Sequence, residues 1–375
     1  MKYMGSKRAM LQNGLGELLA REVLGADRFV DLFSGSAAVA IYVAQNHPVP
    51  VFAFDLQNYS AVLARAVVTR RRPISWQATW RDWQRRARGL QRHTRVPVTP
   101  ALTRAVVEDV RRWSGQQIRL PITRAYGGHY FSAEQAVCLD VLRRTLPEDE
   151  REFTVALAAL IDAASECAAS PGHTAQPFQP TRTARRYIAE AWNRDIFEHT
   201  REVFALLSGQ VAQRVGRADV RDANDVARRL REGDLVFLDP PYSGVHYSRF
   251  YHVLETIARG EAGDVFGVGR YPARELRPRS RYCVRSESAI ALNDLLETIA
   301  GRRARAIMTF PDHSCSNGLS GQVVREIAGR HFRIDEDIVA SRFSTLGGTG
   351  DERANEAGRA ARQEANELLL VLDPL

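Results

Sequence analysis

The sequence predicts an α/β protein in which a mainly helical insert interrupts a sheet of largely parallel strands. Near the N-terminus, the short apolar stretches "RFVDLF" and "VFAFD" stand on either side of a segment with helical spacing. Strands that alternate with helices form parallel sheets, because each helix carries the chain back across the sheet. Strand-like sequence then gives way to helices and loops from about residue 61 to residue 215, and it returns at "GDLVFLDPPY".

The remaining elements follow from their local patterns. Later strands are expected at "RARAIMTF", "FRIDEDIVA" and "NELLLVLD". The apolar run "FTVALAALIDAASECAA" predicts a buried helix rather than a membrane span, since Asp162 and Glu166 interrupt it. The Gly/Thr-rich stretch "STLGGTGDERANEAGRAARQ" predicts a mobile loop before the last strand.

Positive charge is concentrated in one part of the chain. The 375 residues carry a net charge of +8, yet residues 61–130 alone hold fifteen arginines against three acidic residues. Four tryptophans lie in the same segment. Clustered arginine with aromatic residues suits a polyanion such as nucleic acid, although a solvated Arg-rich helix face explains the pattern equally well.

The cysteines and the N-terminus point to a reduced cytosolic protein. The four cysteines have no paired C-x-x-C spacing, so neither zinc nor a disulfide framework is expected. The opening "MKYMGSKRAM" lacks the apolar stretch of a secretory signal. No metal is therefore expected, and a membrane location is not predicted.

Two strand ends carry candidate ligand-binding residues. The Gly/Ser turn of "VDLFSGSAAVA" follows the first strand, and Gly35 there would let backbone approach a ligand. Asp55 ends the second strand, where a carboxylate can accept hydrogen bonds from ribose hydroxyls. As a turn former or helix cap, Asp55 would fit equally well.

The sharpest motif is "DPPY" at residues 239–242. Two prolines make a rigid turn and remove two N–H donors, so Asp239 and the adjoining carbonyls form a cluster of acceptors. Such a cluster suits an exocyclic amine, which brings two N–H groups, and Tyr242 could stack on the base that carries it. Acceptors on both hydrogens would help to localise the nitrogen lone pair toward an incoming methyl group.

With these motifs the chain resembles the Dam-like adenine-specific DNA methyltransferases, which use S-adenosylmethionine (SAM). The resemblance rests on "KYMGSK", "DLFSGSAAVA", "FDLQ", "FLDPPY" and "YSRFYHVLETIARG" in the family's order, with "ADVRDAND" as a looser match. "AYGGHYFSAEQAVCLDVLRR" is similar to the family's insert. The resemblance implies a Rossmann-like SAM-binding catalytic domain of residues 1–60 and 216–375, and an inserted target-recognition domain of residues 61–215.

The resemblance also implies roles for individual residues and a partner. Double-stranded DNA would be the substrate, and SAM the methyl donor without a metal. The catalytic group would be Asp239, Pro240 and Tyr242; the cofactor group Tyr3, Lys7, Phe33, Gly35, Asp55 and Asp239; and the DNA-binding group Arg85, Arg124, Tyr126, His246, Tyr247 and Arg249. Lys7 is one of only two lysines in the chain, and its compact ammonium is expected to fit where a guanidinium would not.

One position departs from the family, and several alternatives stay open. Ala37 stands where the family usually has a second glycine. Amino methylation of cytosine would need the same acceptors, and glutamine methylation of a protein is disfavoured because that family has Asn at the position of Asp239. A DNA-binding protein without turnover is the non-enzymatic alternative. The recognition sequence, a cognate nuclease partner and a bacterial, archaeal or phage origin are left open.

Overall fold

The computed structural model describes residues 5, 7–99, 102–344 and 362–375, and these form two compact units. The α/β unit comprises Met4–Leu56, Ala212–Tyr247 and Arg279–Leu375. The helical unit contains Gln57–Val211 and Ser248–Pro278. Residues 248–278, expected in the catalytic domain, therefore belong to the helical unit.

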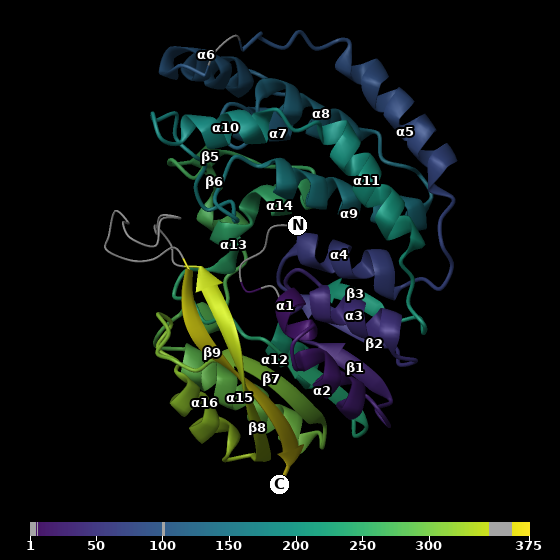
Figure 1. The fold of residues 1–375 in the computed structure, drawn as a ribbon, viewed down its shortest axis with the longest axis vertical. Coiled ribbons are helices and arrows are strands. Elements are labelled where there is room, and N and C mark those ends of the chain that lie inside the picture. The colour runs from purple at the N-terminus through teal and green to yellow at the C-terminus, as the bar shows by residue number, and fades with distance from the viewer. Residues whose placement is uncertain (1–4, 6, 100–101, 345–361) are drawn as a thin grey trace. The chain divides into compact units, whose positions relative to one another are not determined.

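The α/β unit is built on one seven-stranded, mostly parallel sheet with the strand order β3-β2-β1-β4-β7-β9-β8 (Figure 1). All neighbouring pairs from β3 to β7 are parallel, whereas β9 runs antiparallel to both β7 and β8. The strands are β1 (Arg28–Asp31), β2 (Val51–Asp55), β3 (Arg217–Val220), β4 (Asp234–Leu238), β7 (Arg305–Pro311), β8 (Phe332–Ser344) and β9 (Arg362–Pro374). The mixed α/β class with a mainly parallel sheet is as predicted.

Alternating side chains of the central strands are buried on both faces of this sheet. Val30 and Val236 point into a cluster that α12, α15 and α16 complete, while Phe29 and Phe237 stack on each other with ring centroids 6.4 Å apart. Burial on both faces explains the continuous apolar runs in the sequence. The helices of this unit are α1 (Arg8–Leu11), α2 (Leu15–Glu22), α3 (Ala38–Asn46), α12 (Ala223–Ala227), α15 (Ser288–Gly301) and α16 (Gly321–Ala328), with the 3-10 turn η2 (Arg281–Cys283).

The helical unit packs around α9 (Glu150–Cys167), which contacts α4, α11 and α14. A run of small and aliphatic residues makes α9 almost wholly buried, as its sequence predicted. Its other elements are α4 (Asn58–Val68), α5 (Trp76–Gln91), α6 (Arg104–Gly115), α7 (Pro121–Tyr126), α8 (Ala133–Arg144), α10 (Arg185–Trp192), α11 (Ile196–Gly209), α14 (His252–Arg259), β5 (Val265–Phe266), β6 (Tyr271–Pro272) and η1 (Arg274–Leu276). The short helix α13 (Tyr247–Phe250) precedes α14.

Sequence patterns located six of the seven strands and missed β3. That edge strand reads "RADV", and its four residues, two of them charged, lack the apolar run by which the other strands were located. Most of the predicted Gly/Thr-rich loop lies outside the described residues. Within the described ranges, no helix is long and apolar enough to cross a bilayer.

The turn after β1 places Ala37 in the left-handed region. Ala37 has φ 60° and ψ 14°, it is fully buried, and it caps α3. A side chain in this region costs about 1–2 kcal/mol, which glycine avoids. The position that departs from the family's glycine thus keeps a glycine-type backbone.

We predict that Ala37→Gly raises the unfolding temperature and increases the free energy of unfolding by up to ~1 kcal/mol. The backbone strain that glycine relieves in the folded state exceeds the conformational entropy that it adds to the unfolded chain. Ala40→Gly in the same helix is the control and should cost ~1 kcal/mol. Thermal unfolding of both variants measures the difference. Equal destabilisation by the two substitutions would contradict the strain at Ala37.

Candidate active site

The candidate site lies at the carboxyl end of β4, beside the point where the strand order reverses. From β1 the sheet extends through β2 to β3 on one side, and through β4 to β7 on the other. Open α/β sheets bind ligands in the crevice at such a switch point. Asp31 ends β1, Asp55 ends β2 and Asp239 follows β4, so three carboxylates mark this edge.

A buried lysine joins two of the acidic residues at this edge. The Lys7 ammonium lies 2.9 Å from Asp239 Oδ1 and also pairs with Glu367 Oε1. Asp239 accepts a further hydrogen bond of 3.0 Å from the Thr309 hydroxyl of β7. The Lys7 side chain is 5% exposed and that of Asp239 is 18% exposed, so the aspartate is the more accessible member of the pair.

Glu367 reaches the site because β9 is antiparallel. Because β9 runs opposite to β7, the residue at which their pairing begins lies beside the end of β7, and Glu367 pairs in register with Pro311 there. Sequence reasoning missed Glu367 and Thr309. The stretch "NELLLVLD" indicated a strand with an acidic residue at its start, but nothing in it gives the direction of the strand.

The charges of Lys7, Asp239 and Glu367 together set the pKa values of Lys7 and Asp239. Burial alone would lower the pKa of Lys7, but the Asp239 and Glu367 carboxylates outweigh it and raise that pKa. Burial raises the pKa of Asp239, and the Lys7 ammonium opposes this shift. Lys7 is therefore the group that favours an ionised, accepting Asp239.

The turn that carries Asp239 is held in place by hydrogen bonds from the Asn317 side chain. This fully buried amide donates through Nδ2 to the Pro241 carbonyl and to the Tyr282 carbonyl, both at 2.9 Å. The Ser316 hydroxyl accepts a hydrogen bond of 2.9 Å from the Gly244 N–H just beyond the motif. These bonds fix the direction of the turn, and sequence reasoning had no signal for them.

Tyr242 is held against a glycine of the N-terminal segment. A Cβ atom at Gly5, which has φ +72°, would lie 2.5 Å from the Tyr242 hydroxyl. The Tyr247 ring meets the Tyr242 ring edge-on, with centroids 6.4 Å apart. The glycine of "KYMGSK" thus gives the Tyr242 ring room to occupy its position.

The turn after β1 is tied to β2 by Asp55. The Gly35 N–H donates to Asp55 Oδ2 at 2.9 Å, and Gly35 has φ +51°. Phe33 donates its N–H to Asp31 Oδ1 at 3.2 Å, and its ring meets Tyr282 edge-on at 5.1 Å. The structure therefore brings Phe33, Gly35 and Asp55 together at one sheet edge.

Asp31 is a further acidic residue of this edge that sequence reasoning did not select. It is fully buried, and burial raises its pKa to about 8, with the Asp239 and Asp55 carboxylates adding to the shift. The three acidic side chains thus stand close enough at this edge of the sheet for their charges to interact. Its position at the end of the strand in "RFVDLF" was the available signal.

The residues expected to bind DNA have varied surroundings. Tyr126 is fully buried, and its hydroxyl lies 2.8 Å from Thr256 Oγ1. Arg85 pairs with Asp82, and Arg124 pairs with Asp264 at 3.1 Å. These three side chains are thus occupied within the helical unit.

The other expected DNA-binding residues lie between residues 246 and 249. Tyr247 contacts Tyr242, as described above. His246 Nδ1 accepts from the Ser280 N–H at 3.3 Å. The Arg249 guanidinium lies 4.5 Å from the Tyr271 ring centroid. Tyr3, expected to line the cofactor pocket, lies outside the described residues.

Together, these features define a class of protein. A mostly parallel sheet, a switch-point crevice lined by carboxylates and a rigid DPPY acceptor turn are consistent with a methyltransferase fold. Among the described residues, no group of three or more His, Cys, Asp or Glu side chains could hold a metal ion.

The chain belongs to the D12 class N6 adenine-specific DNA methyltransferase family, whose model matches residues 3–92 and 193–300. It is 24% identical to modification methylase StsI of Streptococcus sanguinis over 80% of the chain and 42% of that protein. It is 25% identical to type II methyltransferase M.NlaIII of Neisseria lactamica over 89% of the chain and 90% of that protein. The chain spans less than half the length of StsI and of its Lactococcus lactis relative LlaI.

We predict that Lys7→Met shifts the acidic limb of the pH–rate profile toward higher pH. Without the ammonium, the largest effect that lowers the pKa of Asp239 is lost, so the ionised fraction at pH 6 falls more than at pH 8. Methylation rates between pH 5.5 and 9 measure this shift. Arg8→Met, at an exposed neighbour, is the control, and a Lys7→Met loss that is equal at every pH would contradict the assignment.

We predict that Gly5→Ala lowers kcat by about tenfold or more, since the new methyl group displaces the Tyr242 ring. Gly25→Ala is the matched control. Gly25 has a similar φ of +83°, but a Cβ there would meet nothing within 4 Å. Steady-state kinetics should separate the two variants, and equal losses would show that backbone strain alone matters.

Proposed function

We propose that this protein transfers a methyl group from SAM to the exocyclic N6 amine of adenine in a specific duplex DNA sequence. The observation that supports this most directly is the Asp239 carboxylate, which follows β4 in a rigid Pro-Pro turn and keeps part of its surface open to solvent. Membership of the D12 class favours adenine over cytosine. The target base would have to leave the DNA stack to reach this turn.

The residues of the site fit a cationic methyl donor. Asp239 and Glu367 contribute two carboxylates that pair with the Lys7 ammonium, and Asp55 adds a third acidic side chain at the same edge of the sheet. Asp31, whose pKa burial raises to about 8, would be mainly protonated near neutral pH. SAM would supply an electrophilic methyl group on a sulfonium centre. In this proposal Tyr3, Lys7, Phe33, Gly35 and Asp55 hold it, Lys7 acting through its pairing with Asp239 and Glu367.

The chain's own residues would prepare the amine for attack. Asp239 Oδ and the Pro240 carbonyl would each accept one N6 hydrogen, which leaves the nitrogen lone pair facing the methyl group. Tyr242 would stack on the extruded base, with Gly5 and Tyr247 fixing its ring. Asn317 donates to the Pro241 carbonyl, and in this proposal the Pro240 carbonyl is the second acceptor for the amine.

We further propose the biological setting. The relatives named above are modification methylases, so the protein would act in the cytoplasm as the methylating partner of a restriction nuclease. The helical unit would supply target recognition, with His246, Tyr247 and Arg249 bordering the DNA. Arg85 and Arg124 would bind DNA only if their ion pairs with acidic neighbours opened. Tyr126 is buried, so it would support the fold of the helical unit rather than contact DNA.

The test is methyl transfer from labelled SAM to unmethylated plasmid, followed by nucleoside analysis. We predict label in N6-methyladenine, and a loss of 10²-fold or more in Asp239→Ala, because a preorganised acceptor is removed. Thermal unfolding of Asp239→Ala, followed by circular dichroism, controls for folding. Label in N4-methylcytosine, or none in DNA, would refute the proposal.

A further inference from the structure

The helical unit contains a wide groove that no role described so far uses. Its cavity volume is about 1180 Å³, and its lining comes from the end of α5, the start of α8, α10 with its flanking residues, residues 94–99 and Leu102. Five arginines line it, namely Arg88, Arg92, Arg182, Arg185 and Arg186, while Glu134 is its one acidic residue within the described part of the chain. We call this surface the basic groove.

The arginines of the basic groove differ from others on the same unit. Arg112 and Arg201 pair with acidic residues three positions away on their own helices, at 2.9 and 2.5 Å. The five groove arginines are all exposed, and none forms an ion pair with a described residue. Their charges are thus concentrated on one surface without compensation.

Two groove arginines are held in place by aromatic rings. The Arg88 guanidinium lies 4.2 Å from the Phe197 ring centroid, and that of Arg186 lies 4.6 Å from the Tyr187 ring centroid. Stacking of this kind orients a guanidinium while leaving N–H groups available to an acceptor, although Arg186 also donates one hydrogen bond of 2.6 Å to the Tyr187 hydroxyl. The groove therefore presents oriented donors.

Helix α10 adds a second indication of an anion. It begins with Arg185, Arg186 follows, and no acidic residue lies in its first turn. The N-terminus of a helix favours negative charge, so two arginines there oppose the helix dipole unless an anion covers them. Trp192 at the end of the same helix lines the groove, and its buried Nε1–H has no described acceptor.

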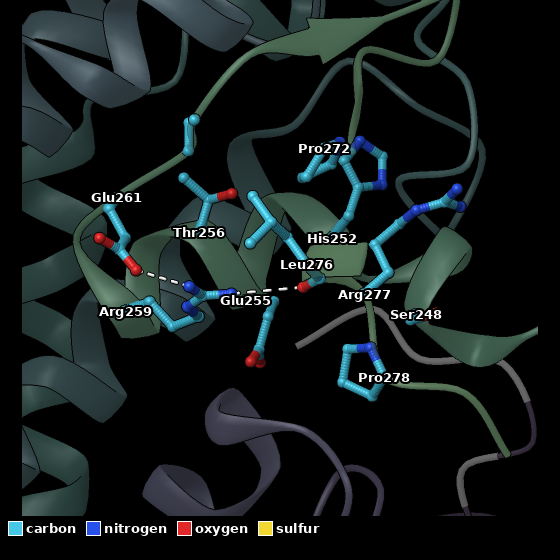
Figure 2. Close-up of a pocket in the computed structure, with 12 residues that line it drawn as sticks. Ser248, His252, Glu255, Thr256, Arg259, Glu261, Pro272, Leu276, Arg277 and Pro278 are labelled. Carbon is cyan, nitrogen blue, oxygen red and sulfur yellow. Dashed lines mark hydrogen bonds and ion pairs between the residues drawn. The ribbon is translucent and has the colours of Figure 1, made fainter. Parts of the chain in front are cut away.

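A smaller cavity of the same unit shows the contrast. Its volume is about 140 Å³. In its wall Arg259 donates to Glu261 at 2.5 Å and to the Leu276 carbonyl at 3.3 Å, as Figure 2 shows. Glu255 in the same wall accepts from Asn58 Nδ2 at 2.6 Å. These charged groups are satisfied internally, whereas those of the basic groove are not.

We propose that the basic groove binds the phosphate backbone of the DNA substrate. This inference rests on the proposed function, which makes DNA the substrate, and it names a surface distinct from Arg85 and Arg124. Charge complementarity supports it: five uncompensated arginines match a polyanion, and the open groove exceeds what a single small anion would fill. Because phosphates carry no base information, the groove would add affinity without sequence preference.

The experiment measures DNA affinity of the full chain against salt concentration. The variant Arg92→Gln, Arg182→Gln, Arg185→Gln removes three groove charges that stack on no ring. The matched control, Arg112→Gln, Arg151→Gln, Arg201→Gln, removes three charges that are paired with acidic residues. Each lost phosphate contact lowers the slope of log K against log salt by about 0.9, so the groove variant should lose about 2 to 3.

We expect the groove variant to weaken specific and non-specific duplexes by the same factor and to keep its SAM affinity. A salt slope equal to that of the wild type, or a loss no larger than in the control, would overturn the groove assignment while leaving methylation intact. Should the triple variant not fold, Arg92→Gln and Arg185→Gln are measured singly, each with an expected slope change of about 0.9. Absence of methylation in the wild type would instead refute the proposed function.

Discussion

The ion pairing of Lys7 with Asp239 and Glu367 is the constraint on which the candidate site depends. A buried ammonium is tolerated only when carboxylates pair with it, and a buried carboxylate is equally costly alone. The N-terminal segment, the end of β4 and the middle of β9 must therefore meet at one place. This requirement places a charged acceptor at the switch point of the sheet.

The rigid backbone of the Pro-Pro turn then fixes the direction in which Asp239 can accept a hydrogen bond. Two prolines limit the turn, and the buried amide of Asn317 holds it from below. Lysine suits the position opposite because its compact head contacts two carboxylates at once with little exposed surface, whereas arginine would bring a planar fork of greater width. Thus a chain that is otherwise rich in arginine has lysine at this position.

The sequence was informative where chemistry and pattern coincide in a few consecutive residues. "DPPY", "DLFSG" and "FDLQ" located Asp239, Gly35 and Asp55 at strand ends, and apolar runs located the central strands. It could not provide Glu367 or Asn317, because their roles depend on the direction of β9 and on a loop that folds beneath the turn. The basic groove likewise required the fold, since composition shows how many arginines there are and not which are paired.

The most direct test of the role of Lys7 is a pH titration of the Asp239 carboxyl group, monitored by ¹³C NMR of carboxyl-labelled protein. The Asp239 resonance is assigned as the one missing from Asp239→Asn. We expect Asp239 to take up its proton at a higher pH in Lys7→Met than in the wild type, because the ammonium favours the ionised form. The same titration midpoint in both proteins would contradict it.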